Sequence, residues 1–121
     1  MSDDLEKRTF KPGQVIFTEG EEGEEAFMVE SGKVEIAKKQ GAAELVLTTI
    51  DVGEMIGEMA LVDPAPRSAT ARAMKPTTVI VIPKRVFDRL LKQTNPVVRS
   101  VLNTTLRRLR QETSKSAKGV L

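Results

Sequence analysis

The sequence of 121 residues and 13.3 kDa fits one compact domain of ordinary size, and its 40% hydrophobic and 30% charged residues suit a soluble globular chain. It has no Cys and no His, which excludes disulfides, thiol and imidazole catalysis and the common zinc and iron sites, so no metal is expected. The net charge of +2 is unevenly divided, because residues 1–62 hold 14 acidic and 6 basic side chains whereas residues 63–121 hold 3 acidic and 13 basic ones. The remaining possibilities are catalysis by carboxylate or lysine side chains, or a binding function without catalysis.

Short apolar or alternating stretches, separated by turn residues, run from about Thr9 to Ile82. The alternation of apolar and polar side chains with a period of two predicts strands. The predicted strands lie near residues 15–17, 26–29, 34–37, 45–50, 69–73 and 77–82. Roughly seven or eight short strands at this spacing are typical of a sandwich, a jelly roll or a barrel, so we expect a mainly β fold.

The periodicity changes after Pro83, where apolar residues recur at the three-and-four spacing of an amphipathic helix over residues 84–92. A second helix is predicted from Pro96 to about Glu112, with Asn95 as its N-cap. This helix carries an apolar stripe at Val98, Leu102, Thr105 and Leu109. We expect the stripe to pack on the β part of the chain by default, although its spacing is also compatible with a homodimer through the helix.

One segment between the strands, Gly53 to Ala71, carries the strongest chemical signal. Gly57 lets the backbone bend and approach a ligand, and residues 58–62 can form one helical turn whose free N–H groups favour an anion. Arg67 follows with a planar guanidinium suited to phosphate, and Glu58 can accept hydrogen bonds from hydroxyls. A ligand that presents an anionic group beside a hydroxyl, as a sugar phosphate does, would fit these groups. A surface turn closed by a Glu58–Arg67 ion pair also explains the pattern.

The motifs on both sides of this segment occur in a fixed order. The pattern G-E-x-x-G-E-x-A-L at residues 53–61 is followed by P-R-S-A-T at residues 66–70. Before them lie F-K-P-G and I-F-T-E-G-E, within residues 10–21, and V-x-x-G-x-V at residues 29–34. This set, over roughly residues 10–112, resembles the cyclic-nucleotide-binding domain family, which includes sensor domains of catabolite activator protein, cAMP-dependent protein kinase regulatory subunits and nucleotide-gated channels. Its first two patterns are similar to that family's phosphate-binding cassette.

The resemblance implies a fold and a set of ligand-binding residues. The fold is a double-stranded β-helix (jelly-roll) barrel with a short phosphate-binding helix and two C-terminal helices. In the family's pattern, Arg67 pairs with the exocyclic oxygens of the cyclic phosphate, and Glu58 accepts the ribose 2′-hydroxyl. The N–H groups of Met59 and Ala60 complete the phosphate cradle, and Gly57 lets the ribose sit close. The implied ligand-binding residues are Gly57, Glu58, Met59, Ala60, Arg67, Ser68 and Ala69.

The resemblance leaves the base less defined than the phosphate. The Ser68 hydroxyl can contact the phosphate or the base edge, so the expected ligand is cAMP with cGMP as the alternative, and no cofactor is expected. Ala69 leaves room for the ligand. The base contact from the last helix is expected at Glu112 and Thr113. Weaker candidates for an apolar pocket wall are Met55, Ile56, Val46 and Leu47, with core packing as the default for Val46 and Leu47.

The implied function is a non-catalytic regulatory module that binds a cyclic nucleotide and changes the position of its C-terminal helix, acting on an unknown protein effector. The alternative is the sensor part of a transcription regulator or channel whose output domain is absent from this chain. A DNA-binding helix-turn-helix would need more than the nine residues that follow Glu112. An enzyme on the related cupin architecture is not expected, because metal-binding cupins hold the metal through His.

The expected organisation is a single domain over residues 1–121, with a β-roll at about 9–82, helices at about 84–112 and a tail at 113–121. The acidic start lacks the basic-then-apolar order of a secretory signal, and no apolar run reaches the length of a membrane span, so we expect a cytoplasmic protein. Direct nucleic-acid binding is not expected, because the only aromatic residues are four Phe and basic side chains do not alternate with stacking rings.

Overall fold

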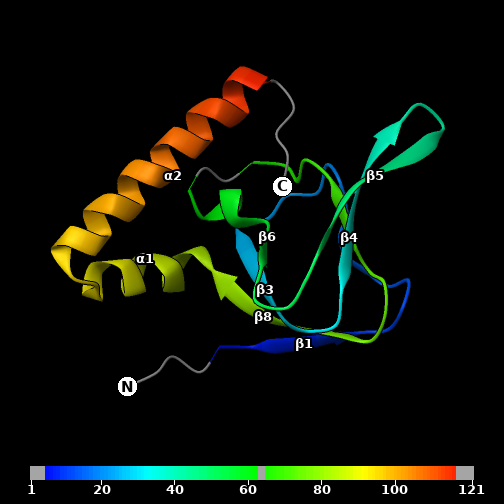
Figure 1. Ribbon diagram of the computed structural model, residues 1–121, viewed down its shortest axis with the longest axis horizontal. Coiled ribbons are helices and arrows are strands. Elements are labelled where there is room, and N and C mark those ends of the chain that lie inside the picture. The colour runs from blue at the N-terminus through cyan, green and yellow to red at the C-terminus, as the bar shows by residue number, and fades with distance from the viewer. Residues whose placement is uncertain (1–4, 63–64, 117–121) are drawn as a thin grey trace.

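The computed structural model describes residues 5–62 and 65–116 (Figure 1). Within these residues, eight strands form two antiparallel four-stranded sheets. The first sheet has the strand order β1 (Lys7–Phe10), β8 (Thr77–Pro83), β3 (Glu25–Ser31), β6 (Met55–Ile56). The second has the order β2 (Val15–Phe17), β7 (Thr70–Ala73), β4 (Val34–Gln40), β5 (Ala43–Ile50). The prediction of a mainly β jelly roll with C-terminal helices is confirmed.

The main hydrophobic core lies between the two sheets. Phe27 on β3 and Val79 on β8 face Val34 and Ile36 on β4, and all four are at most 2% exposed. These residues are the inward members of alternating strands, so the period-two pattern in the sequence becomes a buried face. The roll thereby provides a rigid scaffold on which the segment between β6 and β7 is held.

Three elements complete the structure, and their boundaries differ slightly from the prediction. A short 3₁₀ helix, η1 (Glu58–Leu61), follows β6, and the C-terminal helices are α1 (Lys84–Gln93) and α2 (Pro96–Ser116). Asn95 caps α2 as predicted, because its Oδ1 accepts the N–H of Val97 at 2.8 Å. The sequence did not predict β1, which is largely polar, or β6, which has only two residues.

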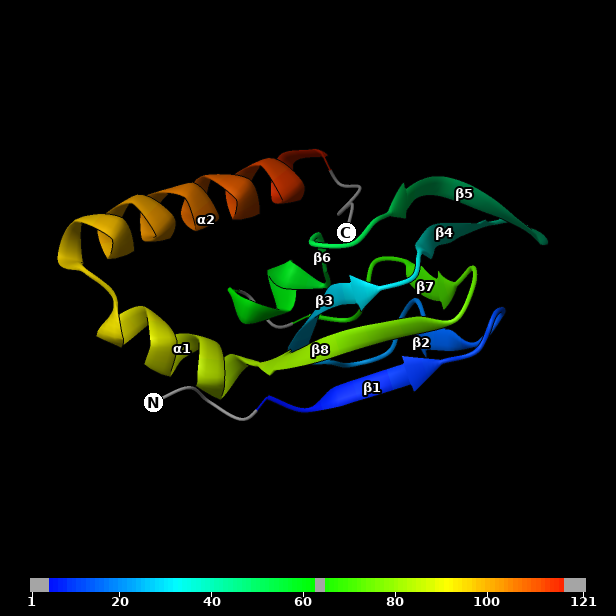
Figure 2. The same cartoon turned by 60° about the horizontal axis from the view of Figure 1, so that its bottom comes forward.

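The prediction that the apolar stripe of α2 packs on the β-roll is wrong. Val98 is 48% exposed and Leu102 is 40% exposed, and α2 leaves α1 at an angle and extends alongside the roll without lying on its sheets (Figure 2). The reason is that α1 already covers this end of the roll, with Val86 buried and Phe87 packed beside Leu61. The side chain of Leu109 lies outside the described part of the chain. No helix among the described residues is long and apolar enough to span a membrane.

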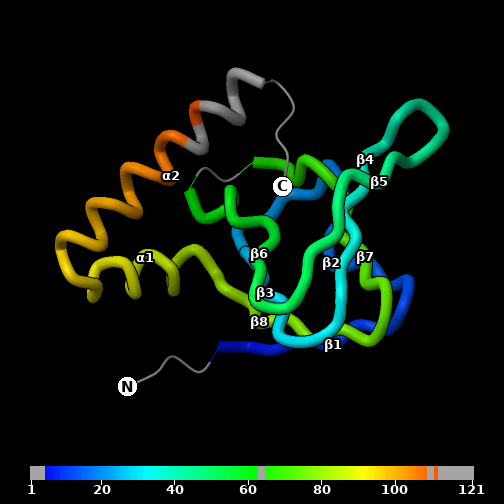
Figure 3. The backbone as a smooth tube through the Cα atoms, viewed as in Figure 1, coloured from blue at the N-terminus to red at the C-terminus, as the bar shows by residue number. Residues whose placement is uncertain are grey.

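Core packing of Val46 and Leu47 is also contradicted. Both lie on β5, which is an edge strand paired only with β4, and they are 52% and 38% exposed. The β4–β5 hairpin projects beyond the rest of the roll (Figure 3). A strand with no sheet above it exposes both of its faces, so the apolar character of these residues does not lead to burial.

Candidate functional site

Residues 53–70, which we call the cassette and which make up nearly all of the segment singled out in the sequence, turn sharply at Gly57. This glycine has φ +71° and ψ 20°, a left-handed conformation that residues with a side chain rarely adopt. A Cβ atom here would lie 2.8 Å from Nη1 of Arg67 and 3.3 Å from the carbonyl oxygen of Glu25. The bend therefore brings the start of η1 directly against the Arg67 guanidinium, which only a glycine permits.

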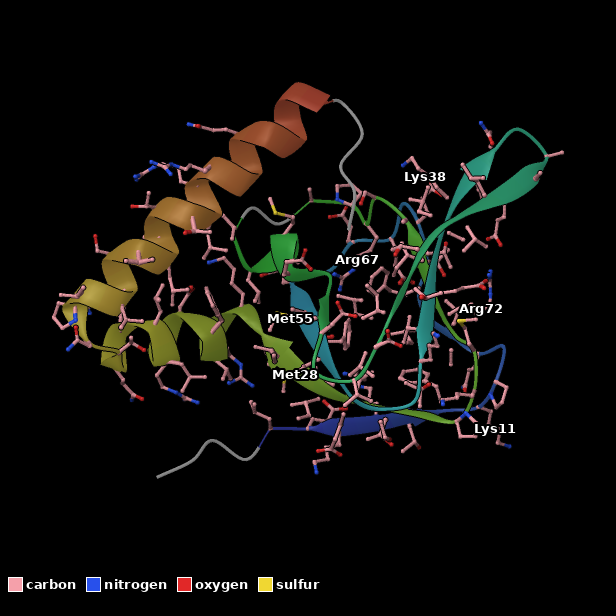
Figure 4. The ribbon with its side chains drawn as sticks, viewed as in Figure 1. Lys11, Met28, Lys38, Met55, Arg67 and Arg72 are labelled. Atoms are coloured by element: carbon pink, nitrogen blue, oxygen red, sulfur yellow. The ribbon has the colours of Figure 1, made fainter. Side chains whose placement is uncertain are left out.

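The backbone of Arg67 is fixed on both sides by the connection between β2 and β3. Its N–H donates to the carbonyl of Glu21 at 2.8 Å, and its own carbonyl accepts the N–H of Gly20 at 2.8 Å. The residue is only 8% exposed. Figure 4 shows the Arg67 side chain inside the outline of the roll, whereas Lys11 and Arg72 point outward at its edge. Arg67 is thus a buried cation with an anchored main chain.

The guanidinium of Arg67 lies over the ring of Phe17 and close to the backbone of Gly23. Its Cζ lies 4.4 Å from the ring centroid of Phe17 and 5.7 Å from that of Phe27. A Cβ on Gly23 would lie 2.6 Å from both Cζ and Nε, so Gly23 also has to be small. The Nε atom is buried and has no hydrogen-bond partner within the described chain. Sequence reasoning missed the roles of Phe17 and Gly23.

Charge and burial act against each other at Arg67. Burial lowers the pKa of the guanidinium, and the nearby carboxylates of Glu25 and Glu21 act in the opposite direction. In the described residues 5–62 and 65–116 Arg67 forms no ion pair. A buried guanidinium with acidic residues near it but not bonded to it retains donors for an anion.

Glu58, the first residue of η1, is a half-buried charged residue of the cassette. Its Oε2 atom is buried and has no hydrogen-bond partner within the described chain. Burial raises the pKa of its carboxyl, and a hydrogen bond to its own backbone N–H partly offsets the rise. The described residues contain no ion pair between Glu58 and Arg67. The alternative of a surface turn closed by such a pair therefore does not hold.

The N–H groups predicted to complete the cradle belong to the first turn of η1. The Ala60 N–H donates to the carbonyl of Gly57 at 3.1 Å and so closes the turn. A phosphate contact at Ala60 would have to share this hydrogen. For the Met59 N–H, the phosphate contact stays a prediction. Both residues nevertheless lie within the same turn as Gly57 and Glu58, next to Arg67.

The last two predicted residues of the cassette lie where the chain enters β7. Ser68 is half-buried, and its backbone carbonyl accepts a hydrogen bond from Nζ of Lys38 at 2.6 Å. Ala69 is 3% exposed and packs in the main core. The structure thus brings Gly57, Glu58 and Arg67 together, with Ser68 directly after them in the chain.

The sequence-based and structure-based comparisons agree with each other. The cyclic nucleotide-binding domain model matches residues 7–94. The chain belongs to this family. It is 37% identical over 91 residues to a cAMP-dependent protein kinase regulatory subunit of Yarrowia lipolytica, covering 75% of this chain and 24% of that protein. It is 31% identical over 108 residues to the cyclic AMP receptor protein of Thermus thermophilus, covering 88% of this chain and 50% of that protein.

Among solved structures, the chain is similar to that of the EAL enzyme Bd1971 in a half-site-occupied form. Its TM-score is 0.84 at 31% identity, with 90% of this chain and 98% of that chain covered. The same enzyme has been solved in cAMP-bound and cGMP-bound forms, at TM-scores of 0.71 and 0.72. The chain therefore spans about a quarter and a half of the two curated relatives, and it matches one chain of a solved structure over 98% of that chain's length.

The remaining predicted residues of this cyclic nucleotide-binding domain are more scattered. Ile56 is fully buried in the main core, Met55 is 37% exposed beside it on β6, and Val46 and Leu47 project on β5. Glu112 and Thr113 fall in α2, but their side chains lie outside the described part of the chain. A cavity of about 300 Å³ lies between η1, α1 and α2, and none of the predicted ligand-binding residues lines it.

Within residues 5–62 and 65–116, no three acidic side chains lie close enough together to hold a metal ion. The site is therefore described by its guanidinium, its carboxyl and its backbone turn.

Proposed function

We propose that this domain binds a cyclic nucleotide at the cassette and acts as a non-catalytic regulatory module. One observation carries the proposal: two buried polar atoms without partners in the described chain, Arg67 Nε and Glu58 Oε2, flank a glycine turn that brings their residues together. A buried guanidinium is suited to a phosphate, and a buried carboxylate is suited to a hydroxyl. A cyclic nucleotide presents both groups next to each other.

The assignment of roles follows what the family resemblance implies, and the positions of Gly57 and Arg67 in the cassette support it. Arg67 pairs with the exocyclic phosphate oxygens, because Nη1 lies beside the start of η1. Glu58 accepts the ribose 2′-hydroxyl, and Gly57 lets the sugar approach the backbone. The N–H of Met59 donates to the phosphate, and the N–H of Ala60 shares its hydrogen between the phosphate and the Gly57 carbonyl. These roles remain assignments that the experiment below tests.

We propose cAMP as the ligand, with cGMP as the alternative. The names of the two curated relatives refer to cAMP, and the EAL enzyme has been solved with each nucleotide. The Ser68 hydroxyl after Arg67 is compatible with both, because it can contact either the phosphate or the base edge. Competition between the two nucleotides on the wild type and on Ser68→Ala separates them.

We further propose that ligand binding moves α2 toward the base, where Glu112 and Thr113 supply a contact. A ligand shifts such an equilibrium only by its differential affinity for the two arrangements. The exposed apolar residues of α2, among them Val98 and Leu102, are available for that contact or for a second copy of the chain. The effector that receives the signal, whether a separate protein in the cytoplasm or an attached output domain, would respond to the helix position.

Calorimetric titration with cAMP tests the proposal. Arg67→Ala should weaken binding by about 2–5 kcal/mol, as expected when one partner of a buried charged pair is removed. Arg72→Ala is the matched control, because Arg72 lies five residues further along the chain and bonds Glu35 and Glu44 on the outer face of the sheet. Equal affinities of the wild type and Arg67→Ala would show that Arg67 is not the phosphate ligand.

The alternative function is the sensor part of a transcription regulator or channel. It is favoured by the cyclic AMP receptor protein relative, of which this chain covers half. It uses the same binding site and differs only in the output. Because the output domain would lie outside this chain, a gel-shift assay of the chain with duplex DNA tests only direct DNA contact by the chain itself, and sequence-independent contact would show a steep dependence on salt.

A further inference from the structure

Lys38 on β4 makes a contact with the cassette that no sequence motif identifies. Its Nζ atom donates to the backbone carbonyl of Ser68 at 2.6 Å and lies 3.5 Å from Oε2 of Glu19. The Lys38 side chain is 38% exposed and that of Glu19 is 22% exposed. In Figure 4, Lys38 lies on the same side of the roll as the end of the cassette. The ammonium is therefore placed between a carboxylate and a cassette carbonyl.

Glu19 is itself fixed, so this ion pair has a defined position. Its Oε1 accepts the backbone N–H of Lys39 at 2.9 Å, and its own backbone N–H donates to Oγ1 of Thr70 at 2.9 Å. The N–H of Lys39 holds the pKa of the Glu19 carboxyl below its ordinary value, and Lys38 adds to this effect. The carboxylate therefore stays charged and keeps the Lys38 ammonium in place.

The Ser68 carbonyl belongs to the Ser68–Ala69 peptide, which is one peptide unit beyond the Arg67 carbonyl. Backbone hydrogen bonds join the main chain of Arg67 to Gly20 and Glu21. The next carbonyl along the chain, that of Ser68, instead accepts a hydrogen bond from the charged side chain of Lys38 on β4. Because a peptide unit is planar, fixing the Ser68 oxygen also fixes the N–H of Ala69 and the orientation of the Ser68 Cα. The hydroxyl of Ser68 and the guanidinium of Arg67 extend from the two ends of this short, restrained stretch.

We infer that Lys38 is a positioning residue for the nucleotide site. Its ammonium holds the Ser68 carbonyl, and thereby sets the directions in which Arg67 and Ser68 present their side chains. This inference rests on the proposed function of the cassette. The role is one of geometry, since Lys38 contacts groups of the protein itself, namely Ser68 and Glu19.

The test compares two neighbouring lysines of one strand. Lys38→Met removes the contact with Ser68, and Lys39→Met removes the same charge from the next position, whose hydrogen bond to Glu19 comes from the backbone N–H and survives the substitution. Lys38→Met should lower the affinity for cAMP in calorimetry about 3- to 10-fold, as expected for a partly exposed hydrogen bond to a charged group. Lys39→Met should stay within about two-fold of the wild type. Lys38→Arg should recover most of the affinity, which a mere loss of packing would not allow.

Amide hydrogen exchange gives a second readout that needs no ligand. Residues 68–70 should exchange faster in Lys38→Met than in Lys39→Met, while the β3 and β8 amides are unchanged, which also shows that the variant is folded. Equal cAMP affinities of Lys38→Met and Lys39→Met would overturn the inference and leave the proposed function standing. Absence of cyclic nucleotide binding by the wild type would overturn the proposed function, and the inference with it.

Discussion

The cassette and α2 both border the β-roll, but they differ in how far their side chains are buried. In the cassette, Leu61 is 4% exposed and Arg67 is 8% exposed, so apolar and charged side chains alike are enclosed. In α2, Val101 is 59% exposed and Leu102 is 40% exposed. These two cassette side chains are therefore enclosed within the chain, whereas α2 keeps apolar surface in contact with water.

The two regions also differ in how they are attached. The main chain of Arg67 is hydrogen-bonded on both sides to the β2–β3 connection, so the cassette cannot shift without breaking those bonds. The helix α2 begins at the Asn95 cap directly after α1, and its direction is set by that short junction. Elements with few buried contacts are the ones that open or reposition at low cost. The cassette is therefore the more firmly attached of the two regions.

The largest expected effect is on the free energy of unfolding, when one leucine of the cassette and one leucine of α2 are each replaced. Leu61→Ala should lower the free energy of unfolding by about 2–5 kcal/mol, because Leu61 is buried against Phe87 and Ile82. Leu102→Ala makes the same chemical change on an exposed face and should cost less than about 0.5 kcal/mol. Urea denaturation of both variants measures the difference. Similar losses would mean that α2 is packed as firmly as the cassette.

Alanine substitutions at two glycines with positive φ test whether the geometry of the cassette matters for nucleotide binding. Gly57 has φ +71° and Gly41 has φ +64°, but only Gly57 has atoms within 4 Å of the position of an added Cβ. Alanine at either site should cost about 1–2 kcal/mol of stability from backbone strain. Only Gly57→Ala should also lower the cAMP affinity, by about 10-fold or more, because the new methyl group displaces the Arg67 guanidinium. Calorimetry and urea denaturation on both variants separate the two effects, and an equal loss of affinity at Gly41 would contradict the geometry.

The sequence predicted those parts that depend on local patterns. Alternation gave most of the strands, the period change at Pro83 gave α1, and Asn95 was recognised as a cap from its own side chain and the proline that follows. The cassette was found because glycine, carboxyl and guanidinium stand at a fixed spacing within one segment. In each case the residues that make the structure are close together in the chain.

Predictions that depend on distant partners were less successful. Whether Val46 and Leu102 are buried depends on whether another element covers them, and α1 and the sheet edge leave both exposed. Phe17 and Gly23 contact the Arg67 guanidinium across about 45–50 residues of sequence, a contact that only the folded topology creates. Periodicity identifies an apolar face but does not say what that face meets.

The smallest effect that we predict concerns Glu58, whose substitution should change the stability and the cAMP affinity in opposite directions. Burial raises the pKa of the Glu58 carboxyl above its ordinary value of 4.5. Between the unfolded and the folded pKa the native state therefore binds more protons than the unfolded chain, so stability falls as the pH rises through this range. Glu58→Gln carries no charge to bury and should raise the free energy of unfolding at neutral pH by less than about 1 kcal/mol, a gain that disappears below about pH 4.

The same substitution should weaken cAMP binding about five-fold, because a carboxylate accepts a hydroxyl more strongly than an amide does. Glu22→Gln, on an exposed residue of the β2–β3 connection, is the control and should alter neither quantity. Urea denaturation at about pH 4 and about pH 7, together with calorimetry, measures both effects. A loss of stability in Glu58→Gln at neutral pH would mean that the carboxylate is stabilised within the fold. It would then belong to the scaffold of the cassette, and the ribose contact would have to be assigned to another group.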